Sequence, residues 1–159
     1  TKLGLSVRVA PADMDLAAVV ADELDQIRGA QANRWIELAA TGNCRGRWDT
    51  ARLQQLVRNL VSNALRYGSP DTAVRVTVSG EASEACLRVA NRGPGVDVQA
   101  HGDIFDPLKR ASVQEDGGDR HGGLGLGLFI VREIAKAHGG TADVHCEAGE
   151  TVFAVHLPR

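Results

Sequence analysis

The chain lacks the marks of several common protein classes. Its 159 residues include three cysteines, Cys44, Cys86 and Cys146, which are far apart and form no CxxC pair. An odd, scattered set argues against a disulfide framework and favours a reducing cytosol, with each thiol packed as a small buried hydrophobe. No apolar run reaches about 18 residues, and the opening TKLGLSVRVA lacks a signal-peptide core. We expect no membrane span, no direct membrane contact and no secretion signal.

An excess of basic charge is also missing. The formal net charge is −2 and the pI is about 6.2, so the sequence lacks the footprint of a nucleic-acid-binding domain. Any phosphate site must therefore be local. Hydrophobic residues (43%) and charged residues (24%) are near globular averages and predict a single domain with a packed core. Because the chain begins at Thr1 without methionine, we expect a fragment of a longer protein.

Hydrophobic periodicity predicts three helices. One is expected from about 14 to 32 with Asp13 as its cap, and a second from Asp49 or Thr50 to about Tyr67, where Gly68 follows. The third is expected at about 124–138, ended by Gly139.

Alternating apolar residues predict about six or seven strands. They are expected at 4–9, at 72–80 and 84–92, in a hairpin of 35–40 with 44–49 around 41–43, and in a closing hairpin of 141–148 with 150–158. The fold class is therefore α+β: a two-layer sandwich of a mixed, mostly antiparallel sheet with helices packed on one face.

The second predicted helix carries a polar strip beside its apolar one. Asn59, Asn63 and Arg66 are spaced i, i+4, i+7, which places them on one face. An amide oxygen is a hard, neutral ligand that suits Mg²⁺, and an arginine near the helix end can reach a phosphate. Tyr67 could stack on a base. The alternative is a solvated polar face whose arginine is favoured by the helix dipole.

Two glycine-rich segments sharpen this interpretation. Four of the six residues from Gly122 to Gly127 are glycine, directly before an apolar helix, and bare backbone N–H groups at a helix start bind anions. Gly93-Pro94-Gly95 predicts a tight turn after Asn91 at a strand end, where backbone could approach a ligand, although for this motif alone an ordinary turn is the better explanation. A Rossmann motif is excluded because no strand precedes the glycines and Leu128 stands where glycine or alanine is required; no P-loop occurs.

Four motifs in order resemble one family. The stretches NLVSNALRYG, NRGPGV, IFDPLKR and GGLGLGLFIVREIAKAHGG are similar to the N box, first glycine box, F box and second glycine box of the catalytic and ATP-binding domain of bacterial sensor histidine kinases. This domain belongs to a superfamily with gyrase, heat-shock chaperone and mismatch-repair ATPases. The resemblance covers nearly the whole chain and implies the Bergerat ATP-binding fold, with residues from about 97 to 123 as the ATP lid.

The resemblance also implies roles for the motif residues. Asn63 would coordinate Mg²⁺, Asn59 stands where related ATPases carry a general-base glutamate, Tyr67 would lie beside the adenine, and Arg110 would contact the γ-phosphate. The residues implied in catalysis are Asn59, Arg66 and Arg110. Those implied in binding ATP are Asn59, Asn63, Arg66, Tyr67, Asn91, Gly93, Gly95, Arg110, Gly123, Leu124, Gly125, Leu126 and Gly127.

Two positions depart from the family pattern. Asn91 stands where the family usually has an aspartate that accepts from the adenine amino group, and a neutral amide makes a weaker bond. We therefore expect ATP binding to survive in weakened form. Leu108 replaces a common aromatic of the F box, which affects lid packing but not the chemistry.

The acceptor of the implied phosphoryl transfer is absent from the sequence. The family's phosphoacceptor histidine has an acidic neighbour, whereas none of the five histidines here is followed by Asp or Glu. We expect the acceptor on a dimerisation domain upstream of residue 1, in a cytoplasmic, homodimeric parent that acts on a response regulator and can be membrane-anchored. The fragment alone would be a monomer. Two alternatives remain: a degenerate nucleotide-sensing or partner-docking domain, and an anti-sigma-type serine kinase.

Overall fold

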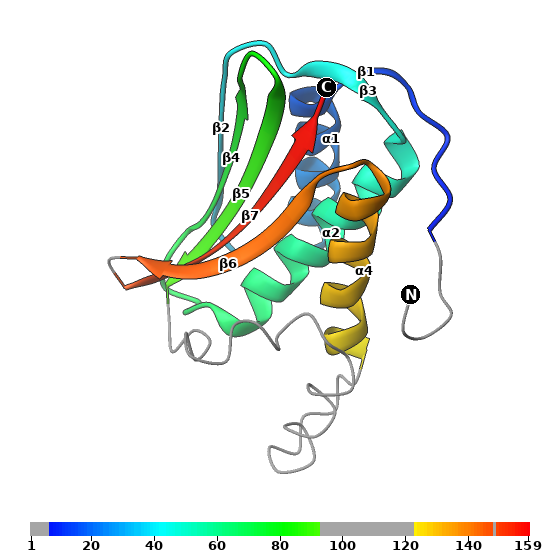
Figure 1. Ribbon diagram of the computed structural model, residues 1–159. Helices are drawn as coiled ribbons and strands as arrows, with labels where there is room; N and C mark the ends of the chain where they lie inside the picture. The colour runs from blue at the N-terminus through cyan, green and yellow to red at the C-terminus, as the bar shows by residue number, and fades with distance from the viewer. Residues whose placement is uncertain (1–6, 93–122, 148) are drawn as a thin grey trace.

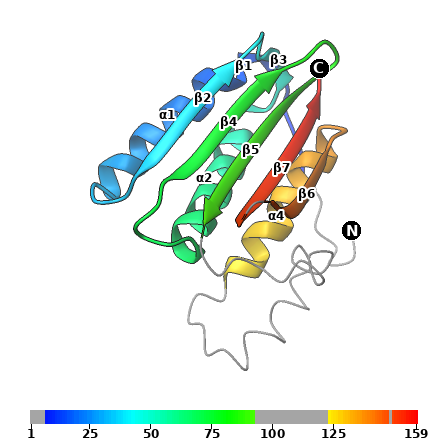
Figure 2. The ribbon, with the colours of Figure 1, turned by 90° about the vertical axis from the view of Figure 1, so that its left-hand side faces the viewer.

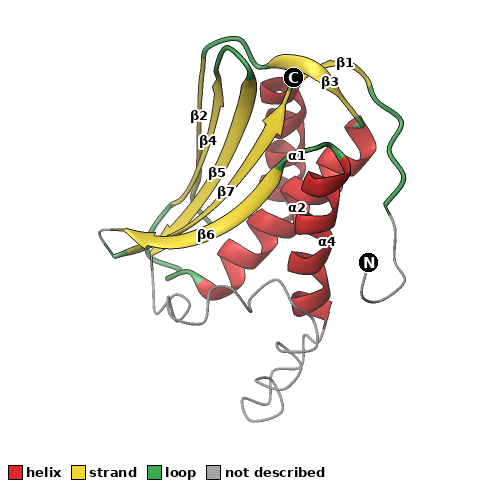
Figure 3. Ribbon diagram, viewed as in Figure 1, coloured by secondary structure: helices red, strands yellow, loops and turns green. Residues whose placement is uncertain are grey.

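A computed structural model describes residues 7–92, 123–147 and 149–159. This part of the chain forms two layers, with a five-stranded sheet on one side and three helices covering one of its faces (Figures 1 and 3). The helices are α1 (Leu16–Ala30), α2 (Thr50–Tyr67) and α4 (Gly123–Ala137). The strands are β1 (Ala12–Asp15), β2 (Ile36–Thr41), β3 (Arg45–Trp48), β4 (Val74–Gly80), β5 (Glu84–Arg92), β6 (Thr141–Glu147) and β7 (Glu150–Pro158).

The large sheet is mixed, as predicted. Its strand order is β2-β4-β5-β7-β6, in which β2 and β4 are parallel and the other neighbours are antiparallel. The predicted α+β sandwich of a mostly antiparallel sheet and three helices is confirmed for the described residues. No helix in this part of the chain combines the length and apolar character needed to cross a membrane.

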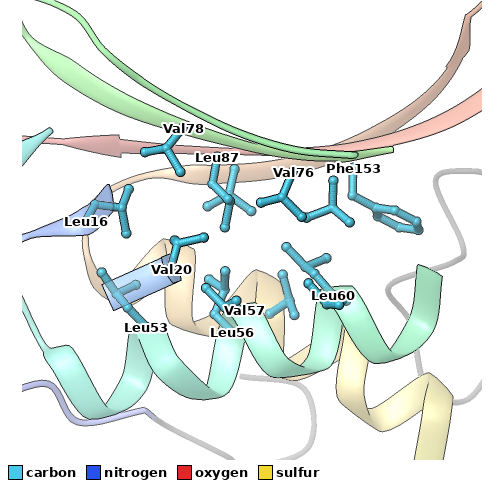
Figure 4. Packing of buried hydrophobic residues seen from close by; sticks show 14 of the residues in the cluster. Leu16, Val20, Leu53, Leu56, Val57, Leu60, Val76, Val78, Leu87 and Phe153 are labelled. Carbon is cyan, nitrogen blue, oxygen red and sulfur yellow. The ribbon is translucent and has the colours of Figure 1, made fainter. Parts of the chain in front are cut away.

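The core fills the space between the sheet and the helices. Leu53, Leu56, Val57 and Leu60 form the buried stripe of α2 because their spacing returns them to one face every turn. They pack against side chains from the sheet, including Leu87, and against α1 (Figure 4). The apolar stripe thus fixes which flank of α2 is left for polar residues.

Asp49 ties the beginning of α2 to two distant segments. Its carboxylate accepts hydrogen bonds from Arg52 N (3.1 Å) and from Ala10 N (2.8 Å). Its own N–H donates to Nε2 of His138 (3.0 Å), which follows α4. Burial alone would raise the pKa of the Asp49 carboxyl, but these backbone hydrogen bonds outweigh burial and hold the pKa below its ordinary 3.8.

Removing this cap is expected to destabilise the fold at neutral pH. Asp49→Ala should cost about 1–2 kcal/mol, whereas Asp49→Asn keeps an oxygen acceptor and should cost less. Because the folded-state pKa is depressed, the carboxylate stabilises the protein above pH 3.8 and this contribution is lost as the pH falls further. Urea unfolding at several pH values should show the gap between wild type and Asp49→Asn closing in acid. A gap that persists would contradict the assigned role.

The predicted hairpin of 35–40 with 44–49 is wrong. β2 instead pairs in parallel with β4, Ile36 opposite Val74, while β3 pairs antiparallel with β1. The intervening loop turns through Gly42 (φ 73°) and packs against Gly80 at the end of β4. A local turn signal was present, but long-range pairing with β4 determined the partner of β2.

The N-terminal predictions also need correction. Residues 7–9 are not in a strand, and the first described strand, β1, begins at Ala12 after Pro11. Asp15 rather than Asp13 caps α1, because its carboxylate accepts from Ala17 N (3.0 Å). Asp13 belongs to β1, where it lies opposite Arg47.

The remaining predicted elements are confirmed with small shifts. α2 begins after Asp49 and ends before Gly68, and β4, β5 and the β6–β7 hairpin lie where alternation placed them. Gly139 follows α4 with φ 79°, the left-handed conformation typical of a helix stop. Cys44 and Cys86 are buried, which raises the pKa of both thiols, but Cys146 is exposed, so the expectation of three buried thiols is wrong.

Candidate functional site

Three elements that are distant in sequence meet at one end of the molecule. The C-terminal end of α2, the end of β5 and the beginning of α4 lie together there (Figure 2). Ser69 N, just beyond α2, donates to Arg92 O at the end of β5 (2.6 Å). On the other side, Asn59 Nδ2 donates to Gly127 O in α4 (3.3 Å). These contacts connect the predicted N box to both predicted glycine boxes.

Gly68 allows the end of α2 to approach β5 closely. A Cβ at this position would lie 2.6 Å from Ala64 O and 2.9 Å from Asn91 Cβ, both far inside normal contact distance. Its φ is −81°, so the requirement is for space and not for a left-handed backbone. Sequence reasoning read Gly68 only as a helix stop. Its place as the last residue of the N-box stretch was the one signal that it belongs to the site.

Asn63 and Asn91 are two largely buried residues at this end of the sheet. Their exposed fractions are 4% and 3%, and neither amide forms a hydrogen bond to any residue that the structure describes. The buried polar atoms that lack a hydrogen-bond partner in the described structure belong to Arg34 and Arg132 and not to these amides, so the two amide tips reach the surface although the residues are largely buried. Two largely buried residues whose amide tips are accessible and have no described partner can present an oxygen and N–H groups to a polar ligand.

Gly127 gives a third indication. It lies in α4 without a positive φ, and a Cβ there would meet only ordinary contacts, 3.8 Å from Asn59 Cγ. Glycine costs about 1 kcal/mol relative to alanine inside a helix. Nothing among the described residues demands that cost, so a surface left bare for a ligand is the reason that fits.

The other predicted site residues are distributed unevenly. Arg66 is exposed, and its side chain lines a pocket toward α1 instead of contacting Asn59. Tyr67 is half-buried at the end of α2. The backbone of residues 123–126, which includes Leu124, Gly125 and Leu126, forms the first turn of α4, as the glycine segment predicted. Outside the described residues lie Gly93, Gly95, Leu108, Arg110 and the predicted lid up to residue 122.

The donor set suits a magnesium–phosphate complex better than an all-protein metal cage. No cluster of three or more His, Cys, Asp or Glu side chains occurs within the described ranges. Mg²⁺ usually keeps several waters and substrate phosphate oxygens and takes only one or two oxygen ligands from the protein. The amide oxygen of Asn63 is a ligand of that kind, on a side chain without another partner in the described structure.

A family model and several relatives match the chain. The model described as histidine kinase-, DNA gyrase B-, and HSP90-like ATPase matches residues 48–159. The bacteriophytochrome of Pseudomonas aeruginosa is 34% identical over 155 residues, which are 98% of this chain and 21% of that protein. The probable sensor histidine kinase TcrY of Mycobacterium tuberculosis is 37% identical over 110 residues, which are 69% of this chain and 23% of that protein. The chain thus spans less than a quarter of the length of these relatives.

Solved structures show the same fold. Histidine kinase ThkA, crystallised in complex with response regulator protein TrrA, superposes with a TM-score of 0.73 at 22% identity. The match covers 94% of this chain and 42% of that one. At this identity the likeness concerns the arrangement of helices and strands alone.

Proposed function

The chain belongs to the family of histidine kinase-, DNA gyrase B- and HSP90-like ATPases, and from this premise we propose that it is the catalytic domain of a sensor histidine kinase. In this proposal it binds ATP with Mg²⁺ and transfers the γ-phosphoryl group to a histidine on a separate dimerisation domain. The observation that carries the proposal is a pair of largely buried residues, Asn63 on α2 and Asn91 on β5, whose accessible amide tips make no hydrogen bond to a described residue and are left for a ligand.

Each amide has a chemically distinct task in this mechanism. Asn63 holds the metal through its oxygen, and Mg²⁺ when bound neutralises phosphate charge. Asn91 accepts from the adenine amino group through its own oxygen and so positions the base. The bare backbone from Gly123 to Gly127 presents N–H groups to the phosphates, while Arg110 adds positive charge.

Asn59 favours transfer to another group over hydrolysis by water. Its Nδ2 donates to Gly127 O, which fixes the orientation of the side chain between α2 and α4. An amide cannot take a proton from water, whereas the glutamate that related ATPases carry here can act as a general base. The side chain therefore orients the phosphate region without activating a water molecule.

In this function the phosphoacceptor histidine and the protein partners lie outside this chain. His138 has one ring nitrogen 2.8 Å from Ile134 O and the other accepting from Asp49 N, and His156 lies 2.8 Å from the Glu84 carboxylate. Because their ring nitrogens are engaged in these contacts, neither histidine is well placed to accept a phosphoryl group. The acceptor would lie on a dimerisation domain of a homodimeric parent, in the cytoplasm where ATP is available, and the phosphoryl group would pass to a response regulator. ThkA, which has this fold, was crystallised in complex with response regulator protein TrrA.

Labelled ATP tests this function directly. The 159-residue chain should bind Mg·ATP but label itself poorly or not at all, and should label an added dimerisation domain that contains the acceptor histidine. Strong self-labelling would contradict the placement of the acceptor. Binding without any transfer would favour a nucleotide-sensing domain, and acid-stable label on serine of an added substrate would favour a serine kinase.

Exchanging Asn91 for aspartate is expected to raise the affinity for ATP and to lower the stability of the free protein. A carboxylate strengthens the hydrogen bond to the adenine amino group, so Asn91→Asp should bind ATP roughly tenfold more tightly. The same charge, buried and unpaired without nucleotide, should lower the melting temperature of the free protein. Calorimetric titration and thermal unfolding measure the two effects. Undetectable binding by the wild type with tight binding by the variant would mean that Asn91 has disabled the natural domain.

A further inference from the structure

Figure 2 shows α1 and α4 on opposite flanks of α2. A pocket is lined by residues of α1, of α2 and of the segment that follows α1. It has a volume of about 400 Å³ and is set between the C-terminal ends of the two helices. We call it the Arg34 pocket. Its lining includes two arginines and no acidic residue, and consists of Ile27, Ala30, Gln31, Arg34, Ser62, Leu65 and Arg66.

Arg34 is held at one nitrogen and unsatisfied at the other two. Its Nη1 donates to Leu65 O, near the end of α2, at 2.9 Å. Its Nε and Nη2 are buried and have no hydrogen-bond partner in the described structure. Because a buried cationic donor without an acceptor is unfavourable, this arrangement indicates that an acceptor is missing.

The two unsatisfied nitrogens define the shape of that acceptor. Nε and Nη2 form one edge of the guanidinium group, with two parallel N–H bonds that match the two oxygens of a carboxylate. Nη1 is already engaged by Leu65, so this edge is the one left for a ligand. Arg66 adds a second positive charge, and no described residue forms a salt bridge with either arginine.

We propose that the Arg34 pocket binds a carboxylate, whose two oxygens are gripped by the Nε–Nη2 edge of Arg34 while Arg66 closes over it. The ligand's methylene groups would pack on Ile27 and Leu65. Since Nε and Nη2 are out of contact with solvent, the Arg34 side chain turns toward the cavity as the ligand enters. The carboxylate can come from a free organic acid or from an aspartate or glutamate of a protein partner.

Side-chain NMR of the arginine Nε–H groups tests the pocket in the 159-residue chain. Titration with succinate, a free diacid, and with N-acetylglutamate amide, a surrogate for a protein side chain, should shift the Arg34 signal. Arg34→Gln keeps a donor for Leu65 O but should weaken binding at least about tenfold. Arg66→Gln should weaken it by a smaller factor. Arg88→Gln, an exposed arginine on β5, should leave it unchanged.

Several outcomes would overturn the proposal. Unchanged succinate affinity in Arg34→Gln would do so, as would inorganic phosphate binding as tightly with the same dependence on Arg34. Preference for succinate over the glutamate surrogate would assign the site to a free acid, and the reverse preference to a protein side chain. Either preference supports carboxylate binding.

A second variant keeps the test decisive if Arg34→Gln fails to fold. Ser62→Glu places a carboxylate in the pocket from α2, so it should raise the melting temperature by about 2–4 °C and abolish the succinate shift. Retained succinate binding in this variant would contradict the proposal.

Nucleotide titrations separate this inference from the proposed function. Arg34→Gln should bind Mg·ATP as the wild type does, and loss of both ligands would show that the pocket is part of the nucleotide site. If the wild type bound succinate but no nucleotide, the kinase proposal would fail and the carboxylate site would stand.

Discussion

Asn63→Ala is expected to abolish phosphoryl transfer while making the free protein more stable. The amide oxygen is the proposed ligand of Mg²⁺, and without it the metal loses its fixed position relative to the phosphates. Loss of one such preorganised interaction typically costs on the order of 100-fold or more in rate. The amide has no partner among the described residues, so its removal leaves no other group there unsatisfied. Alanine is also the better helix former, and together these effects should add about 0.5–1 kcal/mol of stability.

Transfer assays with labelled ATP and urea unfolding measure the two effects on one preparation. Asn63→Asp is the matched variant, because it keeps an oxygen ligand for the metal and should retain part of the activity. Gln54→Ala, on the same helix, should leave transfer unchanged. If Asn63→Ala transferred phosphate at the wild-type rate, or lost stability by several kcal/mol, the amide would be a structural residue and not a metal ligand.

Gly80→Ala is expected to cause the largest loss of stability among the glycine substitutions discussed. A Cβ at this position would lie 1.9 Å from Asn43 O. The backbone fixes the position of the Cβ and the oxygen is itself a backbone atom, so neither can rotate away. The end of β4 and the loop after β2 would have to separate. Relief of such an overlap costs typically 1–3 kcal/mol and more where backbone must move, so we expect about 3 kcal/mol. That corresponds to a melting temperature lower by roughly 10 °C.

Gly29→Ala is the matched control. Gly29 lies near the end of α1, where an added Cβ would meet nothing within 4 Å. The same chemical change should therefore stabilise the protein by about 0.5–1 kcal/mol, since alanine is the better helix former. Thermal unfolding of the two variants should give shifts of opposite sign. A common sign would mean that the close approach of Gly80 to Asn43 is relieved at little cost.

Local signals predicted the elements whose ends are set by their own residues. Asp49 caps α2, Gly68 follows its last turn, and alternation placed β4, β5 and the closing hairpin. The assignments that failed depended on distant partners. Ile36 could have faced the neighbouring segment 44–49, but it lies opposite Val74 across a parallel connection that no short pattern encodes.

In the candidate site, too, local spacing was predictable from the sequence and contacts between distant elements were not. Helical spacing placed Asn59 and Asn63 on one flank of α2, and the structure adds that Asn59 reaches Gly127 and that Asn91 lies against Gly68. These contacts depend on the packing of three elements and could not be predicted from the sequence of any one of them. Helical spacing also grouped Arg66 with the two asparagines, yet its side chain lines the pocket beside Arg34. The unsatisfied edge of Arg34 left no signal in the sequence.

The strand order has a consequence for how the protein is made. β7 lies between β5 and β6 and pairs with β5 along its whole length, from Glu84 opposite Pro158 to Arg92 opposite Glu150. A nascent chain that ends before β7 therefore exposes an open apolar edge, the kind of surface that chaperones bind and that aggregates. Asn91 pairs with Thr151, so its position in the site also depends on β7. Nucleotide should therefore protect only chains in which β7 has been synthesised and has paired with β5.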